Sequence, residues 1–216
     1  MRHRVPESNF RYLFAGLVVL LVTEPIGDAV LGSSSNRVFG ILLSALVLAG
    51  VWGLHPSRLW LRVGRALAAS VVVLGTAGAV WPASSLHTAT WVIAGLFLLL
   101  SVRLGLQAVL AGGRVTTNHL LGAMSVYLLL GVTWALVLGT LHRLAPGSFA
   151  GLSTGSPSEF LYFSFVTLAT LGYGDITPVN PIARMVVYLE AVVGQLYVAV
   201  LIASLVSRHV AARQQD

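Results

Sequence analysis

Cysteine and lysine are missing from this chain of 216 residues, and charged residues of any kind are scarce. The absence of cysteine excludes disulfides, thiolate metal sites and cysteine nucleophiles. Only 9% of the residues are charged and 56% are apolar, whereas an average soluble domain has about 25% charged residues. This composition predicts an integral membrane protein.

The 13 basic residues are all arginines, and they give a net charge of +6. They are spread along the chain beside apolar stretches, which is typical of topology determinants and does not indicate nucleic-acid binding. An N-terminus in the cytoplasm leaves only Arg37, Arg143 and Arg184 outside. We therefore expect a multi-pass protein of the plasma (inner) membrane with its N- and C-termini in the cytoplasm.

Hydropathy predicts six spanning helices and one apolar segment that is too short to span. The long segments have about the 17 to 25 residues that a bilayer requires and run roughly over 11–31, 38–55, 64–81, 89–110, 118–141 and 181–207. The short segment, 157–169, corresponds to about 20 Å of helix. Ser156 and Glu159 in front of it predict a capping box, with Pro157 at the first helical position. The expected fold is an all-α membrane protein with six transmembrane helices and a re-entrant half-helix, whose C-terminal end favours a cation near the bilayer centre.

The half-helix leads into Thr170-Leu171-Gly172-Tyr173-Gly174-Asp175. Gly172 and Gly174 alternate with larger residues, so the backbone can adopt left-handed conformations at every second position. Successive carbonyls can then point to the same side, and the Thr170 hydroxyl adds one more oxygen. Gly-Tyr-Gly-Asp alone is also compatible with a surface turn. The capped half-helix before it and the long apolar helix after it favour an ion-binding loop.

This loop resembles the selectivity filter of potassium channels, Thr-Val-Gly-Tyr-Gly, and residues 156–207 look like the pore region of the bacterial potassium channel family. The stretch 190–197 is also similar to small bacterial members. The resemblance implies K⁺ coordination by the carbonyls of four filter residues, with Gly174 completing the filter; the coordinating residues are Thr170, Leu171, Gly172 and Tyr173. Leu171 replaces the usual valine, which leaves filter stiffness and inactivation open.

One chain supplies one filter loop and a filter needs four, so the resemblance implies a homotetramer around a central pore. The implied function is passive, potassium-selective conduction, with no covalent chemistry and no cofactor besides the permeant K⁺. The expected partners are K⁺ ions, other copies of the chain and membrane lipids, and nucleic acid is not among them.

Around the filter, Tyr162 stands where many members carry a tryptophan. It either donates a hydrogen bond to Asp175 and braces the filter, or packs only as an aromatic ring. Four copies of Asp175, together with Glu159, are expected to ring the outer mouth and concentrate cations.

The last helix carries three candidate gating or pore-lining residues. Gly194, midway along it, is either a point of bending or a small residue for close helix packing. Glu190 is an ionisable group at membrane depth, where such groups are usually functional. It hydrogen-bonds behind the half-helix or, like Gln195, lies near a water-filled cavity. Glu24 and Asp28 in the first helix are either functional in the same sense or lie near the outer interface.

Gly112 and Gly113 break the helical pattern and divide the chain into two expected units. Residues 1–112 form a peripheral unit of four helices, similar in plan to a voltage sensor but poor in charge, and 113–216 form the pore unit. The fourth helix contains Arg103 as its only arginine, and the second and third helices contain no acidic residue. A familiar voltage sensor has basic residues at every third position, so we expect no strong voltage gating. Arginines 58, 62 and 65, before the third helix, are expected to anchor the chain to anionic lipid.

Two alternatives from other classes remain at this point. One is a membrane scaffold that does not conduct. The other is a carrier with broken helices at the midplane, for which paired interruptions in two halves of the chain are expected. Only one such interruption is found, which favours the channel.

Overall fold

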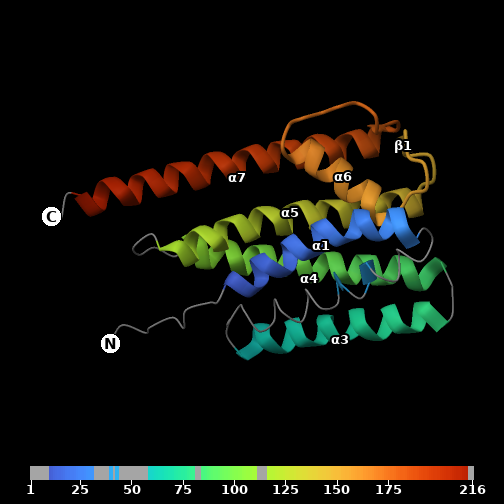
Figure 1. The fold of residues 1–216 in the computed structure, drawn as a ribbon, viewed down its shortest axis with the longest axis horizontal. Coiled ribbons are helices and arrows are strands. Elements are labelled where there is room, and N and C mark those ends of the chain that lie inside the picture. Colours follow the sequence, from blue (N-terminus) through green and yellow to red (C-terminus); the bar gives the residue numbers. More distant parts are fainter. Residues whose placement is uncertain are drawn as a thin grey trace.

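A computed structural model describes residues 10–31, 39–40, 42–43, 58–80, 84–110 and 116–213 (Figure 1). Its helices are α1 (Phe10–Leu31), α3 (Arg58–Val80), α4 (Ser84–Leu110), α5 (Thr117–Leu144), α6 (Pro157–Leu168) and α7 (Pro181–Arg213). In the described part of the chain, α1, α4, α5 and α7 are long and apolar enough to cross a membrane. The protein is therefore a mainly helical, multi-pass membrane protein, with a helix of 12 residues, α6, between two long ones.

Several helix ends differ from the predicted ones. α3 begins at Arg58 and not near residue 64, so Arg62 and Arg65 lie inside the helix with exposed side chains. Likewise, α4 begins at Ser84, α5 runs on to Leu144 and α7 to Arg213. Hydropathy ends a segment at the first polar residues, whereas arginine and leucine are good helix formers and let the helix continue. Apart from four positions, the predicted helix 38–55 lies outside the described residues. The glycine pair 112–113 also lies outside them.

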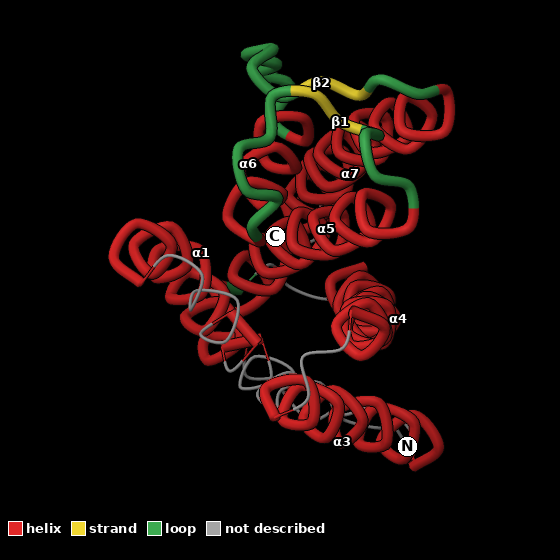
Figure 2. Tube along the Cα trace, turned by 90° about the vertical axis from the view of Figure 1, so that its right-hand side faces the viewer, coloured by secondary structure: helices red, strands yellow, loops and turns green. Residues whose placement is uncertain are grey.

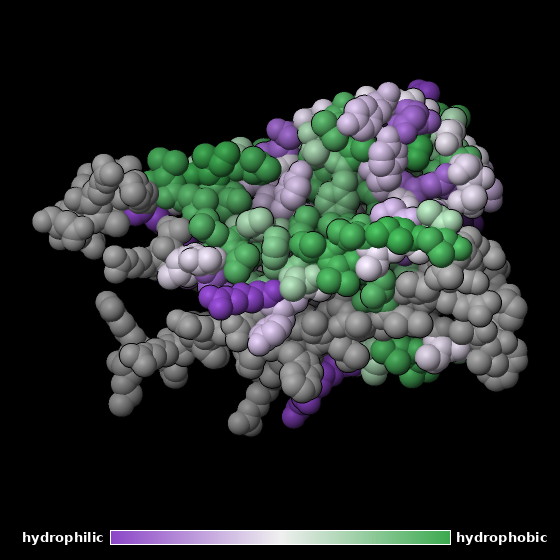
Figure 3. Space-filling view, viewed as in Figure 1, coloured by the Kyte–Doolittle hydropathy of each residue, from purple (hydrophilic) through white to green (hydrophobic). Residues whose placement is uncertain are grey.

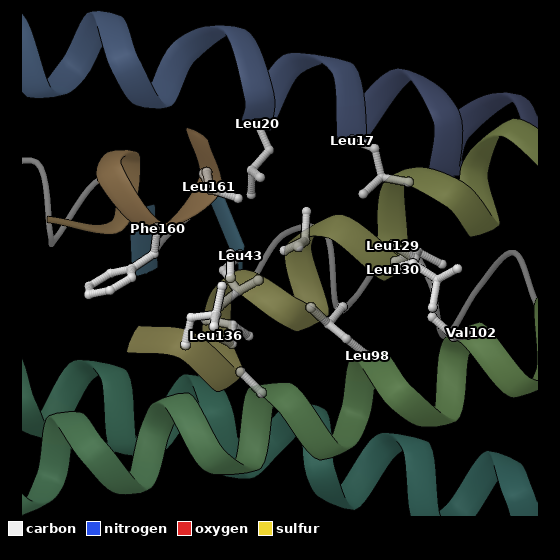
Figure 4. Packing of buried hydrophobic residues seen from close by; sticks show 14 of the residues in the cluster. Leu17, Leu20, Leu43, Leu98, Val102, Leu129, Leu130, Leu136, Phe160 and Leu161 are labelled. Atoms are coloured by element: carbon white, nitrogen blue, oxygen red, sulfur yellow. The ribbon is translucent and has the colours of Figure 1, made fainter. Parts of the chain in front are cut away.

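α5 is the central helix of the molecule (Figure 2). It packs against α1, α4, α6 and α7, and α3 packs on the far side of α4. In the core, Leu17 and Leu20 of α1 point towards α5 and α6, and Leu98 of α4 points towards α5 (Figure 4). The helices of the N-terminal half and those of the C-terminal half therefore share one hydrophobic core.

Glycines let the helices approach closely at three places along α5. A Cβ at Gly122 would lie 2.9 Å from the ring of Phe10 in α1, and a Cβ at Gly139 would overlap the ring of Trp91 in α4. A Cβ at Gly131 would overlap the ring of Phe165 in α6. Small residues that admit a neighbouring helix are typical of membrane proteins, where packing rather than the hydrophobic effect holds helices together.

Polar contacts join helices that are far apart in the sequence. The hydroxyl of Tyr197 in α7 donates to the carbonyl of Ala123 in α5 at 2.5 Å, and Arg208 Nη2 donates to the carbonyl of Val109 at 3.0 Å. The second contact places a cation on the C-terminal end of α4, where helix carbonyls lack partners.

The start of α1 and the end of α7 lie at the same end of the molecule, opposite the end that holds α6 (Figure 1). On the face seen in Figure 3, hydrophilic side chains gather at the α6 end, while apolar ones cover much of α1 and the far part of α7.

The glycine contacts yield a matched pair of variants. Gly139→Ala should destabilise the protein by about 1–3 kcal/mol, because the added methyl group forces Trp91 out of its packing. Gly95→Ala in α4 should be neutral or stabilising by up to about 1 kcal/mol, because the new Cβ would lie 4.0 Å from its nearest neighbour, Leu136. Thermal unfolding of the purified protein in detergent measures both, and equal midpoints would contradict the packing described here.

Candidate functional site

The site is built on the N-terminal end of α6. Ser156 is the N-cap with an extended backbone, and its side chain accepts a hydrogen bond from the amide of Glu159 at 3.4 Å. In return, the Glu159 carboxylate accepts from the amide of Ser156 at 3.2 Å, and Pro157 takes the first helical position. The predicted capping box is confirmed. It fixes where this short helix begins.

The carboxylate of Glu159 also holds the loop in front of the helix. It accepts hydrogen bonds from the amides of Ser153 at 2.7 Å, Thr154 at 3.1 Å and Gly155 at 2.6 Å. Burial by itself raises the pKa of Glu159, but the hydrogen bonds from Ser153 and the next two amides outweigh it and lower the pKa to about 2. Hydrogen bonds within its own loop thus compensate the negative charge of Glu159. Its contribution to a ring of charge that attracts cations stays a prediction.

The backbone after α6 alternates in handedness. φ is +58° at Thr170, +58° at Gly172 and +82° at Gly174, and it is negative at Leu171 and Tyr173 between them. The sequence indicated this freedom at the two glycines but not at Thr170, a β-branched residue for which positive φ is a genuine outlier. A Cβ at either glycine would meet no atom within 4 Å. Backbone conformation, and not crowding within the chain, therefore requires glycine there.

The C-terminal end of α6 holds the start of this loop. The amides of Leu171 and Gly172 both donate to the carbonyl of Val166, at 2.9 and 3.3 Å, and the amide of Thr170 donates to the carbonyl of Thr167 at 3.0 Å. These hydrogen bonds therefore fix the start of the loop relative to α6.

Tyr162 braces the other end of the loop. Its hydroxyl donates to Asp175 Oδ2 at 2.6 Å, and its ring stacks on Tyr173 with 6.5 Å between centroids and 13° between planes. Of the two interpretations of Tyr162, the hydrogen bond to Asp175 is confirmed, and stacking accompanies it. The same bond lowers the pKa of the Asp175 carboxyl and raises the pKa of Tyr162 to about 12.

Two short strands flank the half-helix and its loop. The all-α prediction did not include them. β1 (Phe149–Ala150) pairs antiparallel with β2 (Thr177–Pro178). Beside them, Gly151 has φ +87°, and a Cβ there would overlap the carbonyl oxygen of Asp175. Asn180 caps α7 by accepting from the amide of Ala183 at 2.8 Å, as its position before Pro181 predicted. The strands and Gly151 were missed because pairings of two residues leave no periodic signal.

Glu190 of α7 is fully buried behind α6. The hydroxyl of Ser164 in α6 lies 2.5 Å from Glu190 Oε1 and 2.8 Å from the carbonyl oxygen of Gly131 in α5. Three helices therefore meet at one serine. Of the two predicted positions for Glu190, the one behind the half-helix is confirmed. Ser164 was not singled out in the sequence, because a serine in an apolar helix usually bonds within its own helix.

Gly194 lies where α7 crosses the end of α6. A Cβ at Gly194 would come 2.8 Å from Leu168 Cδ1 and 3.0 Å from the Leu168 carbonyl oxygen. The close-packing interpretation is thus confirmed, and bending at Gly194 stays a prediction. Gln195, next to it, is exposed.

The loop itself is uncovered in a single chain. Every residue from Ala169 to Asp175 is exposed, with 57% of Leu171 and 67% of Tyr173 accessible. An apolar and aromatic segment of this kind, at the end of a buried helix, is typical of an interface.

Comparison with known proteins agrees with this geometry. A family model described as "Ion channel" matches residues 115–210, the part that contains α5, α6 and most of α7. The chain is 36% identical over 83 residues to "Two pore potassium channel c" of Oryza sativa subsp. japonica, and 46% identical over 46 residues to "Inward rectifier potassium channel Kirbac3.1" of Paramagnetospirillum magnetotacticum. Residues 115–210 are thus similar to the ion channel family, and both of these relatives are potassium channels by name. These similarities indicate a channel and not an enzyme.

The matches cover part of each protein. The rice alignment spans 38% of this chain and 17% of the relative, and the Kirbac3.1 alignment spans 21% and 16%. "Protein LctB" of Geobacillus stearothermophilus is 40% identical over 58 residues, which are 27% of this chain and 42% of that protein. No solved structure matches the chain significantly. Helices α1, α3 and α4 lie outside residues 115–210, which the family model matches.

Variants at Glu190 test the junction of three helices. Glu190→Ala removes a fully buried side chain and leaves Ser164 without its closer partner, so it should destabilise the protein by about 2–4 kcal/mol. Glu190→Gln keeps the shape and the hydrogen bond and should cost less than about 1.5 kcal/mol. The exposed Gln195→Ala serves as control and should leave the unfolding midpoint in detergent unchanged. Identical midpoints for all three would place Glu190 at a solvated surface.

Proposed function

We propose that the chain is one subunit of a homotetrameric, potassium-selective channel that conducts K⁺ passively across the plasma membrane. The observation that carries this proposal is the left-handed backbone at Thr170, Gly172 and Gly174. With every second residue left-handed, the carbonyls from Thr170 to Tyr173 can face one side and replace the hydration shell of an ion. The Thr170 hydroxyl adds an oxygen at the inner end.

The direction of α6 supports a cation site. The loop starts at the C-terminal end of this helix, where unpaired carbonyls carry a partial negative charge. The opposite, N-terminal end carries the carboxylate of Glu159, whose charge its own loop compensates. The electrostatic field at the loop therefore favours K⁺ over an anion.

The exposed surfaces support a tetramer. One chain supplies a single loop, whereas a ring of carbonyls needs several copies around an axis. Besides the loop, α7 exposes a row of apolar side chains over several turns, including Val192, Leu196, Val200, Ile202 and Val206. In the proposed tetramer this face lines the pore and contacts the neighbouring subunits.

The proposed topology has six spanning helices with both termini in the cytoplasm and the filter near the outer side. It rests on the excess of arginine on one side. It is supported by the position of the start of α1 and the end of α7 at the end opposite α6 (Figure 1).

Flux through reconstituted protein tests the proposed function. Liposomes that contain the purified protein should pass potassium far faster than sodium. Gly174→Ala should abolish the selective flux, because a Cβ at positive φ costs about 1–2 kcal/mol per residue and four copies act on one ring of carbonyls. Gly147→Ala is the matched control, since Gly147 also has a positive φ, +84°, and open space around it, but lies in a turn outside the loop. It should lose some stability and keep selectivity.

Equal passage of the two ions through the parent protein contradicts a potassium filter. An absence of flux from a well-folded tetramer favours the membrane scaffold.

Voltage should change the open probability only gently. Arg103 is the only arginine of α4, and one charge moved through the whole field is worth about 2.3 kcal/mol per 100 mV, against about 3 to 4 charges per subunit in strongly gated channels. Recordings in planar bilayers over a range on the order of ±100 mV check this. A steep sigmoidal activation by voltage that Arg103→Gln removes would contradict this prediction.

A further inference from the structure

One face of α1 is buried from Leu13 to Glu24. Leu13, Leu17, Leu20 and Glu24 are each at most 2% exposed, and their spacing of three or four residues puts them on one stripe. Leu20 faces Leu161 of α6 in the core (Figure 4). Asp28, four residues after Glu24, is next on this stripe, so it faces the end of α6 where the helix begins.

Asp28 contacts the cap of α6 directly. The hydroxyl of Ser156 donates a hydrogen bond to Asp28 Oδ2 at 2.8 Å. Ser156 is only 6% exposed, so little water competes for its proton. The two residues are 128 positions apart, and Asp28 lies outside the region 115–210 that matches the ion channel model. The contact therefore ties a helix outside the channel domain to the helix that carries the filter loop.

We propose that Asp28 is a positioning residue for the selectivity filter, acting through Ser156; this rests on the proposed function. A serine hydroxyl has one proton and two lone pairs. Donation of that proton to Asp28 leaves a lone pair for the amide of Glu159, which is the capping bond of α6. The carboxylate also lies next to the N-terminal end of α6, whose partial positive charge it balances.

A change in the position of α6 is transmitted to the filter loop through a short, rigid helix. Twelve residues make a rod of about 18 Å, and its last turn holds the loop through the carbonyl of Val166. Because the rod is held by α1 at one end and carries the loop at the other, a shift of its outer end tilts the loop. Misplaced carbonyls then lose affinity for K⁺ before the fold is lost.

A double-mutant cycle tests the proposal. Asp28→Ala and Ser156→Ala should each raise the potassium concentration that gives half-maximal protection of the tetramer against heating by about threefold to tenfold, in keeping with the loss of one hydrogen bond to a charged group. The double variant should be no worse than Ser156→Ala alone, which also loses the capping bond from the amide of Glu159. Asp28→Asn, which keeps an accepting oxygen, should restore most of the affinity. Thr23→Ala is the control on α1, because the Thr23 hydroxyl bonds to Val19 of its own helix.

Two further measurements separate positioning from simple stability. The permeability ratio of potassium to sodium should fall in Asp28→Ala and stay unchanged in Thr23→Ala. Hydrogen exchange at the amides of residues 158–161 should speed up in Asp28→Ala and in Ser156→Ala, without further increase in the double variant. Should Asp28→Ala fail to assemble, Ser156→Ala alone carries the test, because it removes the same hydrogen bond from the other side and should lower the permeability ratio and speed up exchange.

Additive effects, or a selectivity and exchange pattern equal to that of the parent, overturn the proposal. A parent protein that passes no potassium overturns the proposed function instead. In that case the exchange measurement alone decides whether α1 holds α6.

Discussion

A strained stretch of backbone, positive in φ at Thr170 and at two glycines, is the constraint on which the rest of this structure depends. Such conformations cost about 1–3 kcal/mol each at residues other than glycine and persist only where the surroundings hold them. Here the C-terminal carbonyls of α6 bind the inner end of the loop, and the bond from Tyr162 to Asp175 binds the outer end. The pairing of β1 with β2 then fixes the position of the chain directly after the loop. Each of these contacts acts on a segment that is exposed in one chain, so four copies are needed to complete the site that we propose.

Two buried serines inside this apolar protein join helices to one another. Ser164 connects α5, α6 and α7 through Gly131 and Glu190, and Ser156 connects α6 to α1 through Asp28. In a membrane, apolar side chains pack about as well against lipid as against a neighbouring helix. Hydrogen bonds between helices, and glycines that admit a particular ring, therefore specify which helices meet and at what height. α6 takes part in both kinds of contact, which is why its position is fixed more closely than its length of 12 residues suggests.

Sequence reasoning found the parts of the site that depend on local chemistry. The capping box of Ser156 and Glu159, the Asn180 cap and the filter loop follow from residue types at short spacings, and all lie within 25 residues of one another. The partner of Tyr162 was open between two interpretations, because a tyrosine packs and hydrogen-bonds equally well. The positive φ of Thr170 was missed, although the residue itself was predicted to coordinate the ion, because the loop on both sides imposes this conformation and the residue's own preference does not. The contacts of Ser164 and Asp28 depend on how helices far apart in sequence lie side by side, for which one sequence carries no periodic signal. The start of α3 was misplaced because hydropathy responds to charge, while helix formation tolerates arginine.

The central claim, an ion path through a ring of four loops, can be observed directly by crystallography of the purified protein in a rubidium or thallium salt. These ions resemble potassium in size and give anomalous scattering. The account predicts anomalous peaks in a row on a fourfold axis, between the carbonyl oxygens of Thr170 and Tyr173 of four subunits. A folded protein without a fourfold axis at this loop, or peaks only at other sites, would contradict it.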